Sequence, residues 1–176
     1  MVAEYKRRGY AVLAQDECST IVGWGNKSGW LPRGEAITVP TTLSGERFYT
    51  FGVLGHGLEF HTFYEKANGD NFLEFIGKVH RTFGRCVIFL DNASYHKSKA
   101  VRDAVGKFCG DVILEYFLPY TPDLNPVETQ WREQKRHTAG RQYQGVKDMQ
   151  RSIDTMYETG EIKTVKTYDY LTAPAT

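Results

Sequence analysis

The sequence contains no hydrophobic run long enough to span a bilayer, because its longest apolar stretches have the length of a β-strand. The basic residues near the N-terminus, Lys6, Arg7 and Arg8, are not followed by the apolar segment of a secretory signal. Internal repeats and windows of strongly biased composition are also lacking. We therefore expect one globular domain of 176 residues in the cytoplasm, with no membrane partner.

Cysteine is scarce. The three cysteines, Cys18, Cys86 and Cys109, are an odd number and have no Cys-x-x-Cys spacing. This argues against a disulfide framework and a zinc knuckle, and it fits reduced thiols in a cytosolic protein. Cys86 and Cys109 lie in apolar patterns and are most simply core residues.

A strong net charge is absent too, since the total is only +1. The charge is unevenly distributed, because residues 129–151 hold six basic and two acidic side chains, a net charge of +4. Such a basic segment is compatible with binding a polyanion. Solvated helix faces would explain the same counts.

Apolar patterning predicts five strands, at residues 10–16, 46–54, 58–64, 86–90 and 111–118. The first three follow one another with a short glycine-containing turn between the second and third, which predicts an antiparallel meander. A predicted helix separates the last two, which predicts a parallel β-α-β unit. The fold class is therefore α/β: a mixed five-stranded sheet, three antiparallel strands and then two parallel ones, flanked by helices.

Segments with the 3.6-residue periodicity of a helix lie between these predicted strands or after them. The patterns predict helices over residues 70–83, 94–108 and 145–157, and a further helix that begins at Pro126. We expect Asp70 to be the N-cap of the first of these helices and Phe108 to lie on the buried face of the second. Asn125 is the expected N-cap of the helix that begins at Pro126.

Three carboxylates lie at the ends of these predicted elements. Asp16 ends the first strand, Asp91 follows the fourth, and Glu128 is the third residue of the helix after the fifth. Asp91 could merely start a turn or cap a helix near Ser94, and Glu128 could fold back onto Asn125 in a capping box. If the three converge, their repulsion favours cations between them, and oxygen ligands suit Mg²⁺ or Mn²⁺. A pair of such ions is suited to in-line displacement at phosphorus.

Several further polar residues are candidates for contact with phosphate. Lys97 and Lys99 lie in the first turns of a predicted helix, where cations oppose the macrodipole, which favours a role such as holding phosphate. Simple solvated lysines would explain these residues equally well. His96 could orient a phosphate or a neighbouring group, or could be a hydrogen-bonded turn histidine. His56 and His61 have no partner at metal-ligand spacing, and the tryptophans of residues 23–34 could stack on bases or pack against the sheet. The candidate DNA-binding residues are His96, Lys97, Lys99, Arg132, Lys135 and Arg136.

Four motifs, at residues 14–19, 30–34, 89–96 and 118–131, resemble those of D-D-E transposases. The most similar branch is the prokaryotic insertion-sequence members of the mariner-like superfamily, and the resemblance extends over residues 15–135. It implies an RNase H-like fold, divalent-metal-dependent DNA cleavage followed by strand transfer, and insertion at TA dinucleotides. The implied partners are transposon ends and target DNA, in a cytoplasmic, nucleoid-associated protein.

Carried over residue by residue, the resemblance makes Asp16, Asp91 and Glu128 the catalytic, metal-binding carboxylates, holding two Mg²⁺ or Mn²⁺ ions. Thirty-six residues separate Asp91 from Glu128, a spacing typical of the family. Members also carry N-terminal helix-turn-helix domains, whereas fifteen residues precede Asp16 here. We therefore expect residues 1–176 to be a catalytic domain alone, acting as a homodimer or with a partner that supplies the helix-turn-helix domain.

Two other functions remain open on the sequence alone. A catalytically idle transposase remnant would bind DNA or a transposase and act as a regulator. An RNase H-type hydrolase would cleave RNA–DNA hybrids without strand transfer.

Overall fold

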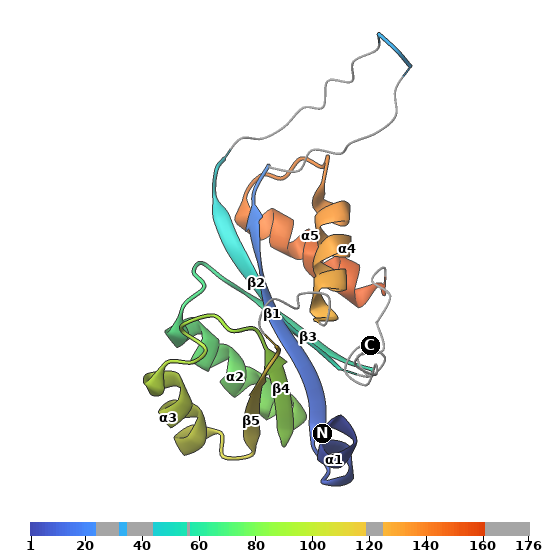
Figure 1. Cartoon of the computed structure of the whole chain (residues 1–176). Coiled ribbons are helices and arrows are strands. Elements are labelled where there is room, and N and C mark those ends of the chain that lie inside the picture. Colours follow the sequence, from blue (N-terminus) through green and yellow to red (C-terminus); the bar gives the residue numbers. More distant parts are fainter. Residues whose placement is uncertain (24–31, 35–43, 56, 119–124, 161–176) are drawn as a thin grey trace.

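Within the described residues, five strands form one mixed sheet that carries helices on both faces (Figure 1). The computed structural model describes residues 1–23, 32–34, 44–55, 57–118 and 125–160. The strands are β1 (Ala11–Ile21), β2 (Arg47–Gly55), β3 (Leu58–Tyr64), β4 (Cys86–Leu90) and β5 (Val112–Tyr116). The helices are α1 (Val2–Arg7), α2 (Gly69–Phe83), α3 (Lys99–Phe108), α4 (Val127–Thr138) and α5 (Val146–Glu158).

The strand order is β3-β2-β1-β4-β5. β1 pairs with β2, and β2 with β3, in antiparallel fashion, whereas β4 is parallel to both β1 and β5. This is the predicted topology, three antiparallel strands followed by two parallel ones, and that prediction is confirmed. None of the helices in the described ranges is long and apolar enough to cross a membrane.

The prediction that Asp16 ends the first strand is wrong. β1 continues to Ile21, because residues beyond Asp16 still pair with β2, as far as Ile21 opposite Arg47. Its parallel pairing with β4 is much shorter and runs only from Ala11 to Ala14. Asp16 therefore lies near the middle of β1, just past the point where its β4 neighbour ends.

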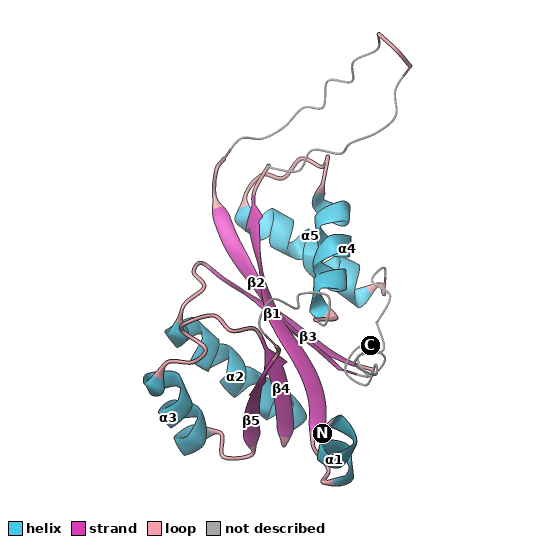
Figure 2. Ribbon diagram, viewed as in Figure 1, coloured by secondary structure: helices cyan, strands magenta, loops and turns pink. Residues whose placement is uncertain are grey.

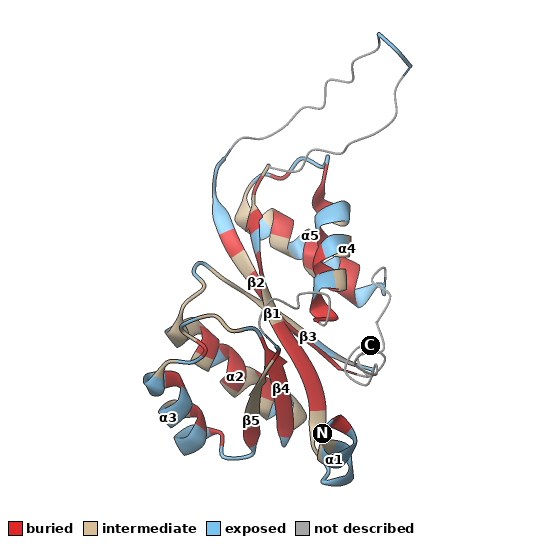
Figure 3. Cartoon of the chain, in the orientation of Figure 1, coloured by how far each residue is buried: buried red, intermediate tan, exposed pale blue. Residues whose placement is uncertain are grey.

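Side chains of β1 alternate between two cores, one on each face of the sheet. Leu13 packs with residues of α2 and α3, whereas Val12 and Ala14 pack with residues of α4. Figure 3 shows the buried residues concentrated on β1, β4 and the inner faces of the helices. A third cluster, formed by residues of β2 and α5, continues the α4 side of the sheet. The sheet is thus the middle of three layers, which Figure 2 shows coloured by element type.

Helix α3 begins later than predicted. Residues 94–97 form a turn, and Ser98 is the N-cap, accepting a hydrogen bond from the Val101 amide. Phe108 is 70% exposed, so its expected place on the buried face is also wrong. Cys109 takes the inward place four residues after Val105, and Phe108 is left on the outer side.

The N-cap of α2 is Asn68, not Asp70 as the sequence suggested. The Asn68 side chain accepts a hydrogen bond from the Asn71 amide at 2.9 Å, and Asp70 lies inside the first turn. We expect Asn68→Ala to lower the free energy of unfolding by about 1 kcal/mol, because an orphan helix N–H loses its acceptor. Asp70→Ala, the control, should cost only a few tenths of a kcal/mol from the helix dipole. Urea denaturation measures both variants, and an equal loss would contradict the assignment.

Candidate active site

Parallel pairing of β1 with β4 brings Asp16 and Asp91 to one place on the sheet. The last pair of that ladder is Ala14 with Phe89. Asp16 and Asp91 each lie two residues further along the two strands. The backbones of two acidic residues that are 75 positions apart in the chain therefore lie side by side where β4 stops and β1 continues.

The Asp16 carboxylate accepts hydrogen bonds on both oxygens. The backbone amide of Glu17 donates to Oδ1 and the indole Nε1 of Trp131 donates to Oδ2, each at 2.9 Å. Burial raises the pKa of Asp16 to about 7, and the carboxylates of Glu17 and Glu128 add to the rise against the lowering effect of these hydrogen bonds. Trp131 follows Glu128 by one turn of α4, so its contact with Asp16 brings this end of the helix beside the Asp16 carboxylate.

Asp91 is half exposed and lies directly after β4. Its Oδ1 accepts a hydrogen bond from the Ala93 amide at 2.9 Å, so the turn-forming role considered from the sequence is present. The same oxygen is 2.8 Å from Nδ1 of His96. The hydrogen bond from His96 lowers the pKa of Asp91, and the nearby Lys97 contributes to the lowering. Asp91 therefore stays ionised well below neutral pH.

His96 is completely buried and bridges two carboxylates. Its Nδ1 faces Asp91, and its Nε2 is 3.1 Å from Oε1 of Glu17. Burial alone lowers the pKa of His96, but the hydrogen bonds to Asp91 and Glu17 outweigh this effect and raise it to about 9. At neutral pH His96 is therefore an imidazolium that donates from both nitrogens. Its full burial excludes direct contact with a DNA phosphate in this conformation.

Glu17 is a functional candidate that the sequence did not single out. It points away from Asp16 to the opposite face of β1, and there it accepts a hydrogen bond from Gln15 Nε2 at 2.9 Å as well as contacting His96. Burial and the nearby Glu17 carboxylate raise the pKa of Tyr95. Glu17 could have been found from the sequence as a second acidic residue, next to Asp16, in an otherwise apolar strand. A carboxylate that is buried in this way requires a cationic or hydrogen-bonding partner.

Glu128 lies in the first turn of α4 and is exposed. The helix begins at Val127, and the Asn125 side chain accepts a hydrogen bond from the Val127 amide at 3.2 Å. Within the described residues the Glu128 carboxylate makes no hydrogen bond back to Asn125, so the capping-box alternative is not realised there. The described residues also contain no group of three His, Cys, Asp or Glu side chains arranged to hold a metal ion.

The candidate phosphate-binding lysines beside Asp91 are both exposed. The Lys97 ammonium lies 5.2 Å from the ring centroid of Tyr116, close to the turn that holds Asp91. Lys99 is 88% exposed and lies 4.0 Å from Asp103. Lys97 is thus on the Asp91 side of the site, whereas Lys99 is the first residue of α3.

On α4 the basic candidates Arg132, Lys135 and Arg136 are also exposed. Arg136 donates a hydrogen bond to Glu133 at 3.1 Å. Burial raises the pKa of the Cys18 thiol, and the charge of Lys135 acts against this rise.

The histidine and tryptophan candidates of the sequence divide into two groups. His56, Trp24 and Trp30 lie outside the described residues. His61 is 2.8 Å from Asp154 and stacks on Tyr157 with ring centroids 4.0 Å apart, so it ties β3 to α5.

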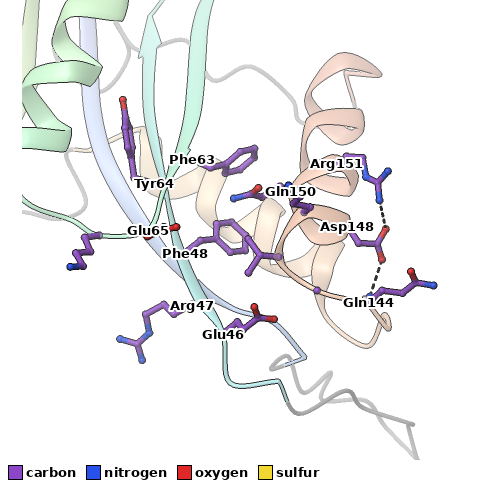
Figure 4. A pocket seen from close by; sticks show the side chains of 14 residues that line it. Glu46, Arg47, Phe48, Phe63, Tyr64, Glu65, Gln144, Asp148, Gln150 and Arg151 are labelled. Carbon is purple, nitrogen blue, oxygen red and sulfur yellow. Dashed lines mark hydrogen bonds and ion pairs between the residues drawn. The ribbon is translucent and has the colours of Figure 1, made fainter.

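A cavity of about 890 Å³ lies between the strands β2 and β3 and the start of α5 (Figure 4). None of the three candidate carboxylates lines it. Figure 4 shows Phe48 and Phe63 at its wall and Asp148 bound to Arg151 and Gln144 at its rim. Its charged lining is mixed: Glu46, Arg47, Glu65, Lys66, Lys147, Asp148 and Arg151. This cavity is therefore separate from the carboxylate site.

A family model described as DDE superfamily endonuclease matches residues 11–150. Among curated proteins, none matches the sequence. Three solved structures share a similar fold. They are the Mos1 transposase paired-end complex with the left transposon end, the Mos1 mariner paired-end complex with Mn, and the catalytic domain of Mos1 mariner transposase.

Each of the two paired-end complexes gives a TM-score of 0.70 at 15% sequence identity, over 97% of this chain and 54% of the other. The catalytic domain gives a TM-score of 0.65 at 14% identity, over 89% of this chain and 75% of the other. The likeness shows the RNase H-like fold. The chain spans about half the length of the Mos1 chains in the paired-end complexes.

Proposed function

Because the chain belongs to the DDE superfamily of endonucleases, we propose that it is the catalytic domain of a transposase that cleaves DNA and joins the cut strands. The motifs at residues 89–96 and 118–131 support a place in the prokaryotic insertion-sequence branch of the mariner-like superfamily. By the same resemblance, insertion would occur at TA dinucleotides of the target DNA. The protein would be cytoplasmic and associated with the nucleoid.

The observation that carries this proposal is that the backbones of Asp16 and Asp91 lie side by side just past the β1–β4 ladder, while α4, the helix of Glu128, contacts Asp16 through Trp131. We propose that these three residues are catalytic. In open α/β sheets ligands bind beyond the carboxyl ends of the strands, and Asp91 lies directly after the carboxyl end of β4.

The donor set fits a divalent cation in its chemistry. Three carboxylates supply the hard oxygen ligands that Mg²⁺ and Mn²⁺ prefer. The raised pKa of Asp16 reflects burial and unrelieved repulsion from neighbouring carboxylates, which a cation would reverse. Glu128 is exposed, so its side chain can turn toward Asp16. Asp91 is held at Oδ1 by His96 and the Ala93 amide, and its Oδ2 would serve as the ligand atom. We propose that the three hold two Mg²⁺ or Mn²⁺ ions, which when bound activate the attacking hydroxyl and stabilise the leaving oxygen.

The remaining residues would bind and orient. The His96 imidazolium holds Asp91 by one oxygen, and the other oxygen is left for a ligand. Lys97 on one side of the carboxylates and Lys135 on the other would contact DNA phosphates, with Lys99, Arg132 and Arg136 further out. Affinity should therefore fall steeply as the salt concentration rises.

Transposon ends and target DNA are the proposed partners. The Mos1 structures that resemble this chain include a complex with a transposon end, and the Mos1 chain in it is about twice as long as this chain. A homodimer, or a partner that supplies a helix-turn-helix domain, would provide recognition of the ends.

The test is nicking of supercoiled DNA in the presence of Mn²⁺. The wild-type protein should nick the plasmid only with metal, and Asp91→Asn should remove the activity while the protein still folds, as circular dichroism would show. Equal activity in both proteins would rule against the assignment. Folded wild-type protein that binds DNA but never nicks it would favour the idle regulator, and cleavage confined to RNA–DNA hybrids would favour an RNase H-type hydrolase.

A further inference from the structure

Trp131 lies one helical turn after Glu128 and is 2% exposed. The six-membered ring of its indole lies against Gly52 on β2. A Cβ atom on Gly52 would lie 2.6 Å from Cη2 of the indole, closer than a side chain can tolerate. Gly52 is therefore required for close approach, the usual meaning of a glycine inside a strand.

Gly52 is also the residue that pairs directly with Asp16 across the antiparallel β1–β2 ladder. Paired residues project to the same face of a sheet. The missing side chain of Gly52 leaves a space beside the Asp16 carboxylate, and the indole fills that space. In this position the indole N–H donates to Asp16 Oδ2 at 2.9 Å.

The Trp131 side chain thus contacts the carboxylate of Asp16, and Trp131 lies on the same helix as Glu128. The Glu17 amide holds the second oxygen of Asp16, so both oxygens have a fixed donor. Fixed donors on both oxygens restrict rotation of the carboxylate about its Cβ–Cγ bond.

The rest of the inner face of α4 is held by hydrogen bonds as well. Buried Gln134 donates to the hydroxyl groups of Thr20 and Thr50 at 3.3 and 3.1 Å. Asn125, which precedes the helix, donates a hydrogen bond to the backbone carbonyl of Gln15 at 3.3 Å. Buried polar contacts of this kind favour one relative position over its neighbours. α4 is therefore held against sliding along the sheet.

We propose that Trp131, seated on Gly52, is a positioning residue that orients Asp16 and sets the separation of Asp16 and Glu128. This inference rests on the proposed function, because it concerns the affinity of these carboxylates for a divalent cation. Trp131 does not touch the ion or the DNA in this role.

The experiment measures Mn²⁺ binding directly, by electron paramagnetic resonance of the free ion, together with thermal unfolding. Trp131→Phe keeps an aromatic ring but removes the N–H donor. We expect it to bind Mn²⁺ about tenfold to a hundredfold more weakly, as loss of an outer-shell partner does. Gly52→Ala should weaken binding in the same way, because the indole must move away from Asp16.

Leu54→Ala is the matched control. Leu54 is fully buried in the same apolar cluster as Trp131 and lies on the same face of β2 as Gly52. It should lower the melting temperature and leave Mn²⁺ affinity unchanged. A Trp131→Phe protein that binds as tightly as the wild type overturns the inference alone, as does an equal loss of affinity in Leu54→Ala. A wild-type protein that binds no Mn²⁺ overturns the proposed function, and the inference with it.

Discussion

Glu128→Gln is expected to reduce metal-dependent DNA cleavage on the order of 10²–10³-fold, the scale seen when one preorganised charge-stabilising group is lost. The substitution keeps the shape of the side chain and removes its charge. Because Glu128 is exposed and makes no hydrogen bond within the described residues, its structural role there is small. The free energy of unfolding should change by less than about 1 kcal/mol, mainly through the helix dipole.

Glu133→Gln provides the control on the same helix. Glu133 accepts a hydrogen bond from Arg136 and lies more than one turn from Glu128. Its replacement should leave the nicking rate unchanged and alter stability slightly, as surface ion pairs do. Nicking of supercoiled DNA measured on wild type and both variants decides the matter. Full activity in Glu128→Gln would remove this residue from the catalytic set.

His96→Ala is expected to cost about 3–5 kcal/mol of stability, the usual loss when one partner of a buried ion pair is removed. The substitution leaves Glu17 with no cation beside it in a nearly buried position, since the Glu17 side chain is only 9% exposed. Chemical denaturation measures the loss. His61→Ala is the control, because the Asp154 partner of His61 is 46% exposed and that pair is partly solvated. A His96→Ala protein no less stable than the control would contradict the bridging role.

The stability of the wild type should also depend on pH through His96. Its pKa is raised in the folded state from 6.5 to about 9, so the protonated form stabilises the fold. This contribution is complete below about pH 6.5 and is lost as the pH rises through about 9. The pKa of Asp16 is raised from 3.8 to about 7 in the folded state, so its ionisation lowers stability as the pH rises between these two values. Above about pH 7 the contribution of Asp16 no longer changes with pH. In His96→Gln the decline in the free energy of unfolding above pH 7 should disappear, as urea denaturation at a series of pH values would measure. An unchanged decline in this variant would show that His96 is not its cause.

The topology was predictable because it depends on apolar periodicity and on connections between strands. The division into three antiparallel strands followed by two parallel ones, and the position of Asp91 directly after a buried strand, follow from patterns in the sequence. The position of Asp16 was not predictable from its own strand, because the length of β1 is decided by pairing with β2. In the same way, the late start of α3 follows a turn that carries His96 into the interior, a tertiary contact with no local signal.

The site residues show the same division. Placement at the ends of predicted elements, together with the family resemblance, pointed to Asp16, Asp91 and Glu128. The residues that support these three lie far away in the sequence. Gly52 and Trp131 have meaning only together, because the glycine provides space for the indole and the indole donates to Asp16. Glu17 was visible only as an acidic neighbour of Asp16, and its partner His96 is 79 residues away.

The difference in length between β1 and β4 has a consequence for local stability. Up to Ala14, β1 has a strand on each side, but beyond it the only described strand partner is β2. Amide groups in the second half of β1 should therefore exchange with solvent hydrogen faster than those in the first half, because opening them breaks fewer bonds. Asp16 lies at the boundary between the part of β1 that is paired on both sides and the part that is paired with β2 alone. We expect the second part to open without unfolding of the whole sheet.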